Sequence, residues 1–239
     1  MSSQFPQIEA LRHGLVASCQ ASEDSPLNTP PIIAALAKSA EMGGAIGFRI
    51  DYPQNVAAVR AISPLPIIGI NKIYTRGYQI YITPTYTSAE VVVQAGADLV
   101  AIQATGQPRP GGETFESIVR QIHANLKVPV MADVGTTDQG IQAIEQGADL
   151  VATTMATSEP YGKPEDGPAL HIVRDLVRRT NIPVVVEGQI WTVENVRACF
   201  EAGAYAIVIG SAITAPQLIT RRFVQAIPIM DGRASTIMN

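Results

Sequence analysis

The segment QAGADLVAIQ at residues 94–103 recurs with small changes as EQGADLVATT at 145–154 and as EAGAYAIVIG at 201–210. In each copy a short turn containing glycine precedes a run of apolar, mostly aliphatic residues. Glycine is common just after a helix because it adopts the left-handed backbone conformation without a Cβ clash. The repeat therefore predicts three helix-to-strand junctions in a chain that alternates between the two elements.

A second form of junction has a proline before the apolar run, at Pro66, Pro129 and Pro183. Proline is tolerated as the first residue of a strand. The two forms interleave and predict six strands, at about 66–72, 98–103, 129–133, 149–153, 183–187 and 205–209. GLVASC at 14–19 and GAIGFRI at 44–50 supply two more.

Eight apolar strands separated by helical segments favour an α/β fold, a single (β/α)8 TIM barrel, because the strands of parallel sheets are buried on both faces. A doubly wound open sheet would usually carry a GxGxxG turn after its first strand, and this sequence has none. The 239 residues suit one domain spanning 1–239. Residues 1–8 and about 230–239 are expected to be loosely held termini.

Composition excludes several partners. The net charge is −4 and the pI is near 5.4, so we expect neither nucleic acid nor an anionic membrane as a partner. Cys19 and Cys199 lack CxxC spacing, and no metal site is indicated. The absence of a leader-like segment and of a long apolar run predicts a cytoplasmic protein, whose oligomeric state is left open.

Polar residues stand at the predicted carboxyl ends of the strands. They are Gln20, Arg49, Lys72, Gln103, Asp133, Thr153, Thr154 and Glu187. Any one of them could be a salt bridge or a cap. Because strand ends of this kind form the mouth of such a barrel, a lysine, an arginine and two carboxylates there together indicate acid–base catalysis.

Small residues follow the last two predicted strands, at Gly188, Gly210 and Ser211. Backbone N–H groups at this position commonly bind phosphate in barrels. These residues are therefore candidates for phosphate binding, although the glycines could equally serve only as turn residues.

Several motifs occur together, in order: SCQA at 18–21, PIIGINK at 66–72, YITPT at 81–85, EGQI at 187–190 and AITAPQLITRRF at 212–223. MAD at 131–133 and VATT at 151–154 lie between them. With these motifs the chain resembles the N-acylglucosamine-6-phosphate 2-epimerase family, also called the N-acetylmannosamine-6-phosphate 2-epimerases, over nearly its whole length.

The resemblance implies that Lys72 and Glu187 move a proton at carbon 2 of an amino-sugar phosphate, converting N-acetyl-D-mannosamine 6-phosphate to N-acetyl-D-glucosamine 6-phosphate. No metal or redox cofactor follows from that reaction. The side chains expected to bind the substrate are Gln20, Arg49, Asp133, Gln103 and Thr153.

The sequence departs from the family pattern at four positions: Ile73 and Gln189 replace arginines, Gln103 replaces an aspartate, and Ala215 replaces the arginine of AITRP. The last change predicts weaker phosphate binding. Two alternatives stay open: a barrel enzyme for another phosphorylated metabolite, and a non-catalytic barrel that binds a sugar phosphate. The presence of both Lys72 and Glu187 favours an enzyme, because binding alone requires no acid and base on opposing strands.

Overall fold

Eight parallel strands close into a barrel in the order in which they occur along the chain. The computed structural model describes residues 5–157, 160–161 and 167–228. The strands are β1 (Leu15–Cys19), β2 (Gly47–Asp51), β3 (Ile67–Ile70), β4 (Leu99–Gln103), β5 (Val130–Asp133), β6 (Leu150–Ala152), β7 (Val184–Glu187) and β8 (Ala206–Ile209). The expected (β/α)8 barrel is confirmed. β2 begins at residue 47, inside the expected range of 44–50, and β3 ends at residue 70, inside the expected range of 66–72.

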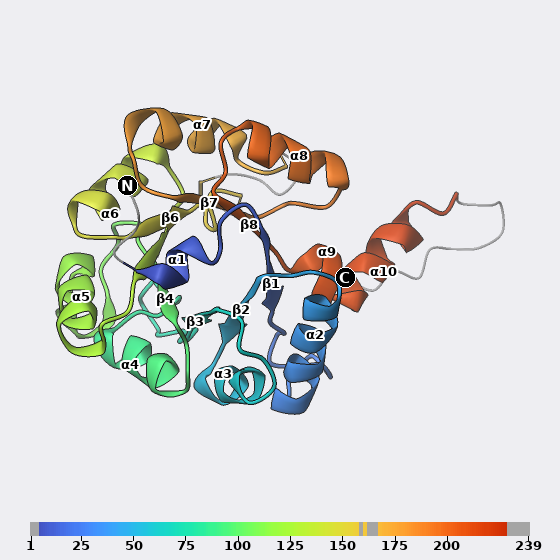
Figure 1. The fold of residues 1–239 in the computed structure, drawn as a ribbon, viewed down its shortest axis with the longest axis horizontal. Coiled ribbons are helices and arrows are strands. Elements are labelled where there is room, and N and C mark those ends of the chain that lie inside the picture. The colour runs from blue at the N-terminus through green and yellow to red at the C-terminus, as the bar shows by residue number, and fades with distance from the viewer. Residues whose placement is uncertain (1–4, 158–159, 162–166, 229–239) are drawn as a thin grey trace.

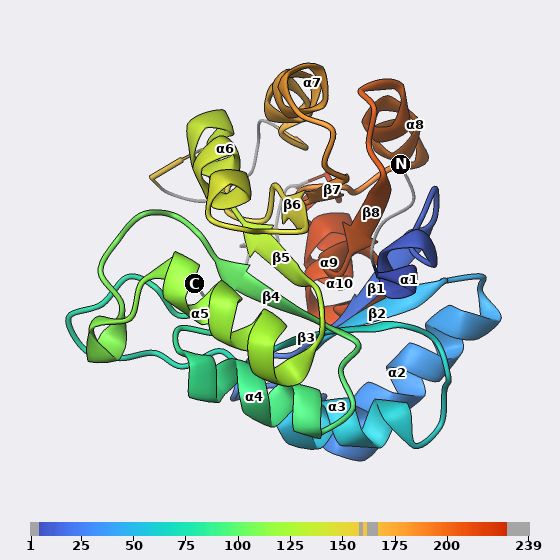
Figure 2. The ribbon, with the colours of Figure 1, turned by 60° about the vertical axis from the view of Figure 1, so that its left-hand side comes forward.

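Helices surround the barrel on all sides (Figures 1 and 2). They are α1 (Pro6–Glu9), α2 (Pro30–Met42), α3 (Pro53–Arg60), α4 (Tyr86–Gln94), α5 (Phe115–Gln121), α6 (Thr137–Glu145), α7 (Leu170–Arg179), α8 (Val193–Glu201), α9 (Ser211–Thr214) and α10 (Pro216–Gln225), with a 3₁₀ turn at Pro110–Gly112 and a π-turn at Ile122–Leu126. In the parts of the chain that are described, no helix has the length and apolar character needed to cross a bilayer.

The repeat glycines adopt the conformation that the sequence predicted for them. Gly96, Gly147 and Gly203 follow α4, α6 and α8 with φ angles of 111°, 99° and 98°. This left-handed backbone turns the chain from each helix toward the next strand. The repeat is therefore a set of equivalent helix ends, each leading into β4, β6 or β8.

Alternation along the strands divides the core into two parts. Side chains pointing outward pack against the helices, whereas those pointing inward fill the barrel. The lower interior is apolar and consists of Val16, Ile68, Leu99, Met131, Leu150, Val185 and Ala206. Two residues further along β2 and β5 the same face carries Arg49 and Asp133, so the interior becomes polar toward the carboxyl ends of the strands.

The N-terminal segment closes the opposite end of the barrel. Ile8 in α1 is 1% exposed and Leu11 is fully buried, and both pack against the barrel interior. The Tyr205 hydroxyl donates a hydrogen bond to the Ile8 carbonyl at 3.2 Å. Within the start that was expected to be loosely held, residues 6–8 belong to α1 and Ile8 is buried; residues 1–4 and 230–239 lie outside the described residues.

The left-handed helix end at Gly147 generates a stability prediction. Gly147→Ala should lower the free energy of unfolding by about 1–2 kcal/mol, because an L-residue is strained at this φ and its Cβ would lie 3.2 Å from Val119 Cγ1. Urea unfolding followed by circular dichroism measures the change. Gly43→Ala is the matched control: Gly43 ends α2 with an ordinary φ of −80°, so that variant should not be destabilised. Equal losses in both variants would contradict the explanation.

Candidate active site

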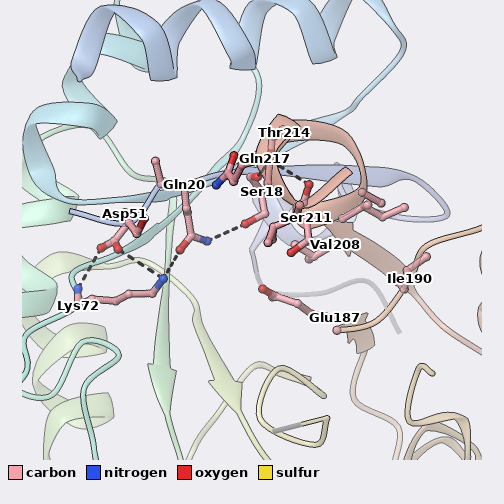
Figure 3. Close-up of a pocket in the computed structure, with 18 of the residues that line it drawn as sticks. Ser18, Gln20, Asp51, Lys72, Glu187, Ile190, Val208, Ser211, Thr214 and Gln217 are labelled. Atoms are coloured by element: carbon pink, nitrogen blue, oxygen red, sulfur yellow. Dashed lines mark hydrogen bonds and ion pairs between the residues drawn. The ribbon is translucent and has the colours of Figure 1, made fainter. Parts of the chain in front are cut away.

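A cavity of about 830 Å³ opens at the carboxyl ends of the strands. Its walls come from the segments after β1, β2, β3, β7 and β8 and from the first turn of α10. The close-up in Figure 3 shows Lys72 and Glu187 on opposite sides of this space, with Ser18, Ser211 and Gln217 between them along one edge. The position agrees with the general rule that barrel enzymes place their sites at this end.

Lys72 lies two residues beyond the end of β3, where it forms an isolated antiparallel bridge with Ile82. Its backbone N–H donates to Asp51 Oδ1 at 3.0 Å. Its Nζ donates to Gln20 Oε1 at 2.6 Å and lies 3.6 Å from Asp51 Oδ2. The ammonium group is therefore anchored at one wall of the cavity by an amide and a carboxylate (Figure 3).

Asp51 was not among the side chains expected from the sequence. It is the last residue of β2, it follows Arg49 by two residues, and only 3% of it is exposed. Burial raises the pKa of its carboxyl group, although the Lys72 charge opposes the rise. Because Asp51 follows Arg49 by two residues, the alternation of side chains along a strand places both on the inner face. The strand expected from the sequence ends at residue 50 and so does not include Asp51.

Glu187 ends β7 on the other side of the cavity, with 15% of its side chain exposed. Its Oε2 lies 2.9 Å from Arg49 Nη1 and accepts a hydrogen bond from the Thr154 hydroxyl at 3.2 Å. Burial raises the pKa of Glu187 to about 7; Arg49 lowers it, and the nearby Asp133 charge raises it further. Both protonation states of this carboxyl group are therefore accessible near neutral pH.

Arg49 and Asp133 lie behind the lining residue Glu187 and are not themselves among the residues that line the cavity. Two parallel hydrogen bonds join them, Nη1 to Oδ1 at 3.0 Å and Nη2 to Oδ2 at 2.6 Å, and the two side chains are 1% and 0% exposed. Burial alone would lower the pKa of Arg49, but Asp133 and Glu187 raise it above its ordinary value. The pair meets Glu187 through Arg49, and the direct substrate binding expected of Arg49 and Asp133 stays a prediction.

Thr153 and Gln103 also lie away from the cavity. The Thr153 hydroxyl bonds to the backbone of Glu187, because Thr153 falls on the outward-facing register of β6. Thr154 takes the inward position and donates to Asp133 Oδ1 at 2.6 Å. The binding role expected of Thr153 stays a prediction, because its hydroxyl group is held by the Glu187 backbone in this structure.

Gln103 is 2% exposed, and its side-chain oxygen accepts from the backbone N–H of Tyr81 at 3.0 Å. Its amide nitrogen donates to the Thr105 hydroxyl at 3.0 Å. The side chain therefore holds the segment after β3 in place, and its expected contact with the substrate stays a prediction. Gln20 is the only side chain of the expected substrate-binding set that lines the cavity.

The three small residues expected to bind phosphate lie together at the end of the cavity formed by the segments after β7 and β8. Gly188 has φ 106°, and a Cβ there would lie 2.5 Å from Thr157 Oγ1, so glycine is required. Gln189 follows in the left-handed region as well, with φ 55°. Gly210 precedes α9, which begins at Ser211. Their role toward an anion stays a prediction.

Known proteins resemble this chain over most of its length. Residues 33–228 match the family described as "Putative N-acetylmannosamine-6-phosphate epimerase". A relative from Caldanaerobacter subterraneus subsp. tengcongensis, named "Putative N-acetylmannosamine-6-phosphate 2-epimerase", is 42% identical and covers 92% of this chain and 94% of its own length. One of the same name from Clostridioides difficile is 38% identical, covering 93% and 99%.

A solved structure agrees with these sequence relatives. The N-acetylmannosamine-6-phosphate 2-epimerase from Clostridium perfringens superimposes with a TM-score of 0.90 at 34% identity, covering 95% of this chain and 99% of that one. Family match, sequence relatives and fold therefore point the same way. The chain belongs to the N-acetylmannosamine-6-phosphate epimerase family.

Proposed function

We propose that this chain is an isomerase, an N-acylglucosamine-6-phosphate 2-epimerase, that interconverts N-acetyl-D-mannosamine 6-phosphate and N-acetyl-D-glucosamine 6-phosphate. The observation that carries the proposal is the placement of Lys72 and Glu187 on opposite sides of one cavity (Figure 3). The names of the family and of its relatives support the choice of substrate.

The reaction requires proton transfer on both faces of one carbon. When the sugar ring opens, carbon 2 lies next to an aldehyde, and loss of its hydrogen gives an enediolate-type intermediate. Return of a proton to the opposite face inverts the configuration. An acid and a base that approach from opposite sides meet this requirement, whereas a single group on one side would return the proton to the face it left.

In the mannosamine-to-glucosamine direction, Lys72 is the general base that takes the proton from carbon 2. The protonated Glu187 then gives a proton to the other face, which leaves a lysine ammonium and a glutamate carboxylate. Exchange with solvent resets both groups, and the reverse direction uses the same groups in exchanged roles. The ammonium formed on Lys72 also stabilises the developing negative charge on the oxygen of carbon 1.

Arg49 and Asp133 act on this step through Glu187. The bidentate pair fixes the guanidinium so that Nη1 meets Glu187 Oε2, and Thr154 bonds to both carboxyl groups. Glu187 is thereby aimed into the cavity. We assign Arg49, Asp133 and Thr154 as positioning residues.

The two proposed proton-transfer groups generate a direct prediction. The wild-type protein with N-acetylmannosamine 6-phosphate in deuterated water should form the glucosamine epimer and lose the proton NMR signal of carbon 2. Lys72→Ala should lower kcat by at least about 100-fold, because positioned general acid–base groups contribute roughly that much. Lys38→Ala, which removes an exposed lysine of α2 paired with Glu41, should leave kcat unchanged. Normal turnover by folded Lys72→Ala would refute the assignment of the base.

The raised pKa of Glu187 predicts where its carboxyl group titrates. The pH profile of kcat/KM reports both proton-transfer groups, because Glu187 must be protonated to donate and Lys72 must be unprotonated to accept. A carbon-13 NMR titration of the labelled protein reports Glu187 alone, and its carboxyl signal should titrate at about 7 in the folded protein. Glu187→Gln should lack this transition, and a titration at the ordinary value of 4.5 would contradict the shift.

The free energy of unfolding should also depend on the protonation of Glu187. The folded-state pKa of Glu187 lies above its ordinary value of 4.5, so the folded state holds a proton that the unfolded chain releases. Its contribution is present at low pH and is lost as the pH rises from about 4.5 through about 7. Urea unfolding should show this decline in the wild type and a smaller one in Glu187→Gln, which cannot ionise. Parallel curves would contradict the shift.

A further inference from the structure

The cavity is short of positive charge for a phosphorylated ligand. Of the described residues that line it, only Lys72 is a lysine or arginine, whereas Glu23, Asp24, Asp51 and Glu187 all contribute carboxyl groups. Lys72 is already held by Gln20 and Asp51. A phosphate dianion in this cavity therefore needs a cation from just outside the lining set.

Trp191 forms a fixed platform in the wall of the cavity. It lines the cavity, and its backbone N–H donates to Asn195 Oδ1 at 3.1 Å. Its indole Nε1–H donates to Gln189 Oε1 at 2.9 Å. Two hydrogen bonds thus set both the backbone and the ring orientation of Trp191, and they hold the left-handed turn at Gln189 beside it.

Arg222 brings a cation to this platform. Its guanidinium carbon lies 5.0 Å from the centroid of the Trp191 ring, in the range of a cation–π interaction. Leu218, four residues earlier on α10, lines the cavity, so Arg222 lies one turn further along the same helix face. Within the described residues no carboxylate lies within ion-pair distance of Arg222, which leaves its charge available to a ligand.

We propose that Arg222, stacked on Trp191, binds the phosphate group of the substrate and is a specificity-determining residue. The inference rests on the proposed function for the identity of the sugar. The planar guanidinium can stack on the indole ring and still offer two parallel N–H groups to phosphate oxygens, which a lysine cannot. The backbone turns at Gly188 and Gly210 lie at the same end of the cavity.

Trp191 is the only tryptophan of the chain, so its fluorescence reports directly on this end of the cavity. Titration with inorganic phosphate and with N-acetylmannosamine 6-phosphate should change the emission of the wild type. The same titrations on Arg222→Gln should show binding about tenfold weaker or more. Arg221→Gln is the matched control, because it removes an equal charge from the adjacent residue of the same helix, and its dissociation constants should equal those of the wild type.

Kinetics separate binding from chemistry. Arg222→Gln should raise KM for the phosphorylated sugar about tenfold with kcat within about twofold. Any slow turnover of unphosphorylated N-acetylmannosamine should be unaffected. Arg222→Lys should restore only part of the lost affinity. It keeps the positive charge, but a lysine cannot stack on the indole ring and donate two parallel hydrogen bonds to the phosphate.

The two proposals fail in different ways. If the wild type turns over the phosphorylated sugar and Arg222→Gln has the same KM as Arg221→Gln, the role of Arg222 is wrong and the proposed function stands. If the wild type shows no epimerisation but phosphate binding is lost in Arg222→Gln and kept in Arg221→Gln, the anion site stands and the proposed reaction is wrong. If anion binding were weakened equally in both variants, the effect would come from the loss of any positive charge on α10, and the proposed site would be wrong.

Discussion

The ion pair between Arg49 and Asp133 is the interaction on which the upper half of the barrel depends. Both side chains are buried, so neither charge has water to stabilise it, and each requires the other. Breaking such a pair is costly because one uncompensated charge stays inside, which makes the geometry rigid. The rigidity extends to Glu187, which shares Arg49 with Asp133. The structure thus holds a carboxyl group of raised pKa at a fixed place.

The two proposed proton-transfer groups are held in different ways. Glu187 sits on a strand end, packed against a cation and a threonine, and burial dominates its pKa. Lys72 lies beyond its strand in a short bridged segment and meets Asp51 and Gln20. A base and an acid on opposite walls of one cavity suit a reaction that removes a proton from one face of a sugar carbon and returns one to the other.

The proposed phosphate site is built from other parts of the fold. The cavity wall there carries glycines, an indole ring and a short helix start. The proposed cation, Arg222, belongs to α10 and contacts Trp191, which lines the cavity. In these proposals, proton transfer depends on residues at the strand ends of the barrel and anion binding depends on the final helix.

The sequence by itself determined the barrel, its strand order and most of the polar strand ends, because these depend on local features: glycine helix ends, proline strand starts and apolar runs. It also identified Lys72, Glu187 and Gln20, which line the cavity. Only the tertiary structure decided which polar residues line the cavity. Asp51, at the end of β2, lines it, whereas the Thr153 hydroxyl bonds to the Glu187 backbone and Thr154 bonds to Asp133. Along an extended chain a shift of one residue reverses the direction of a side chain, so small differences at the strand ends decide these positions.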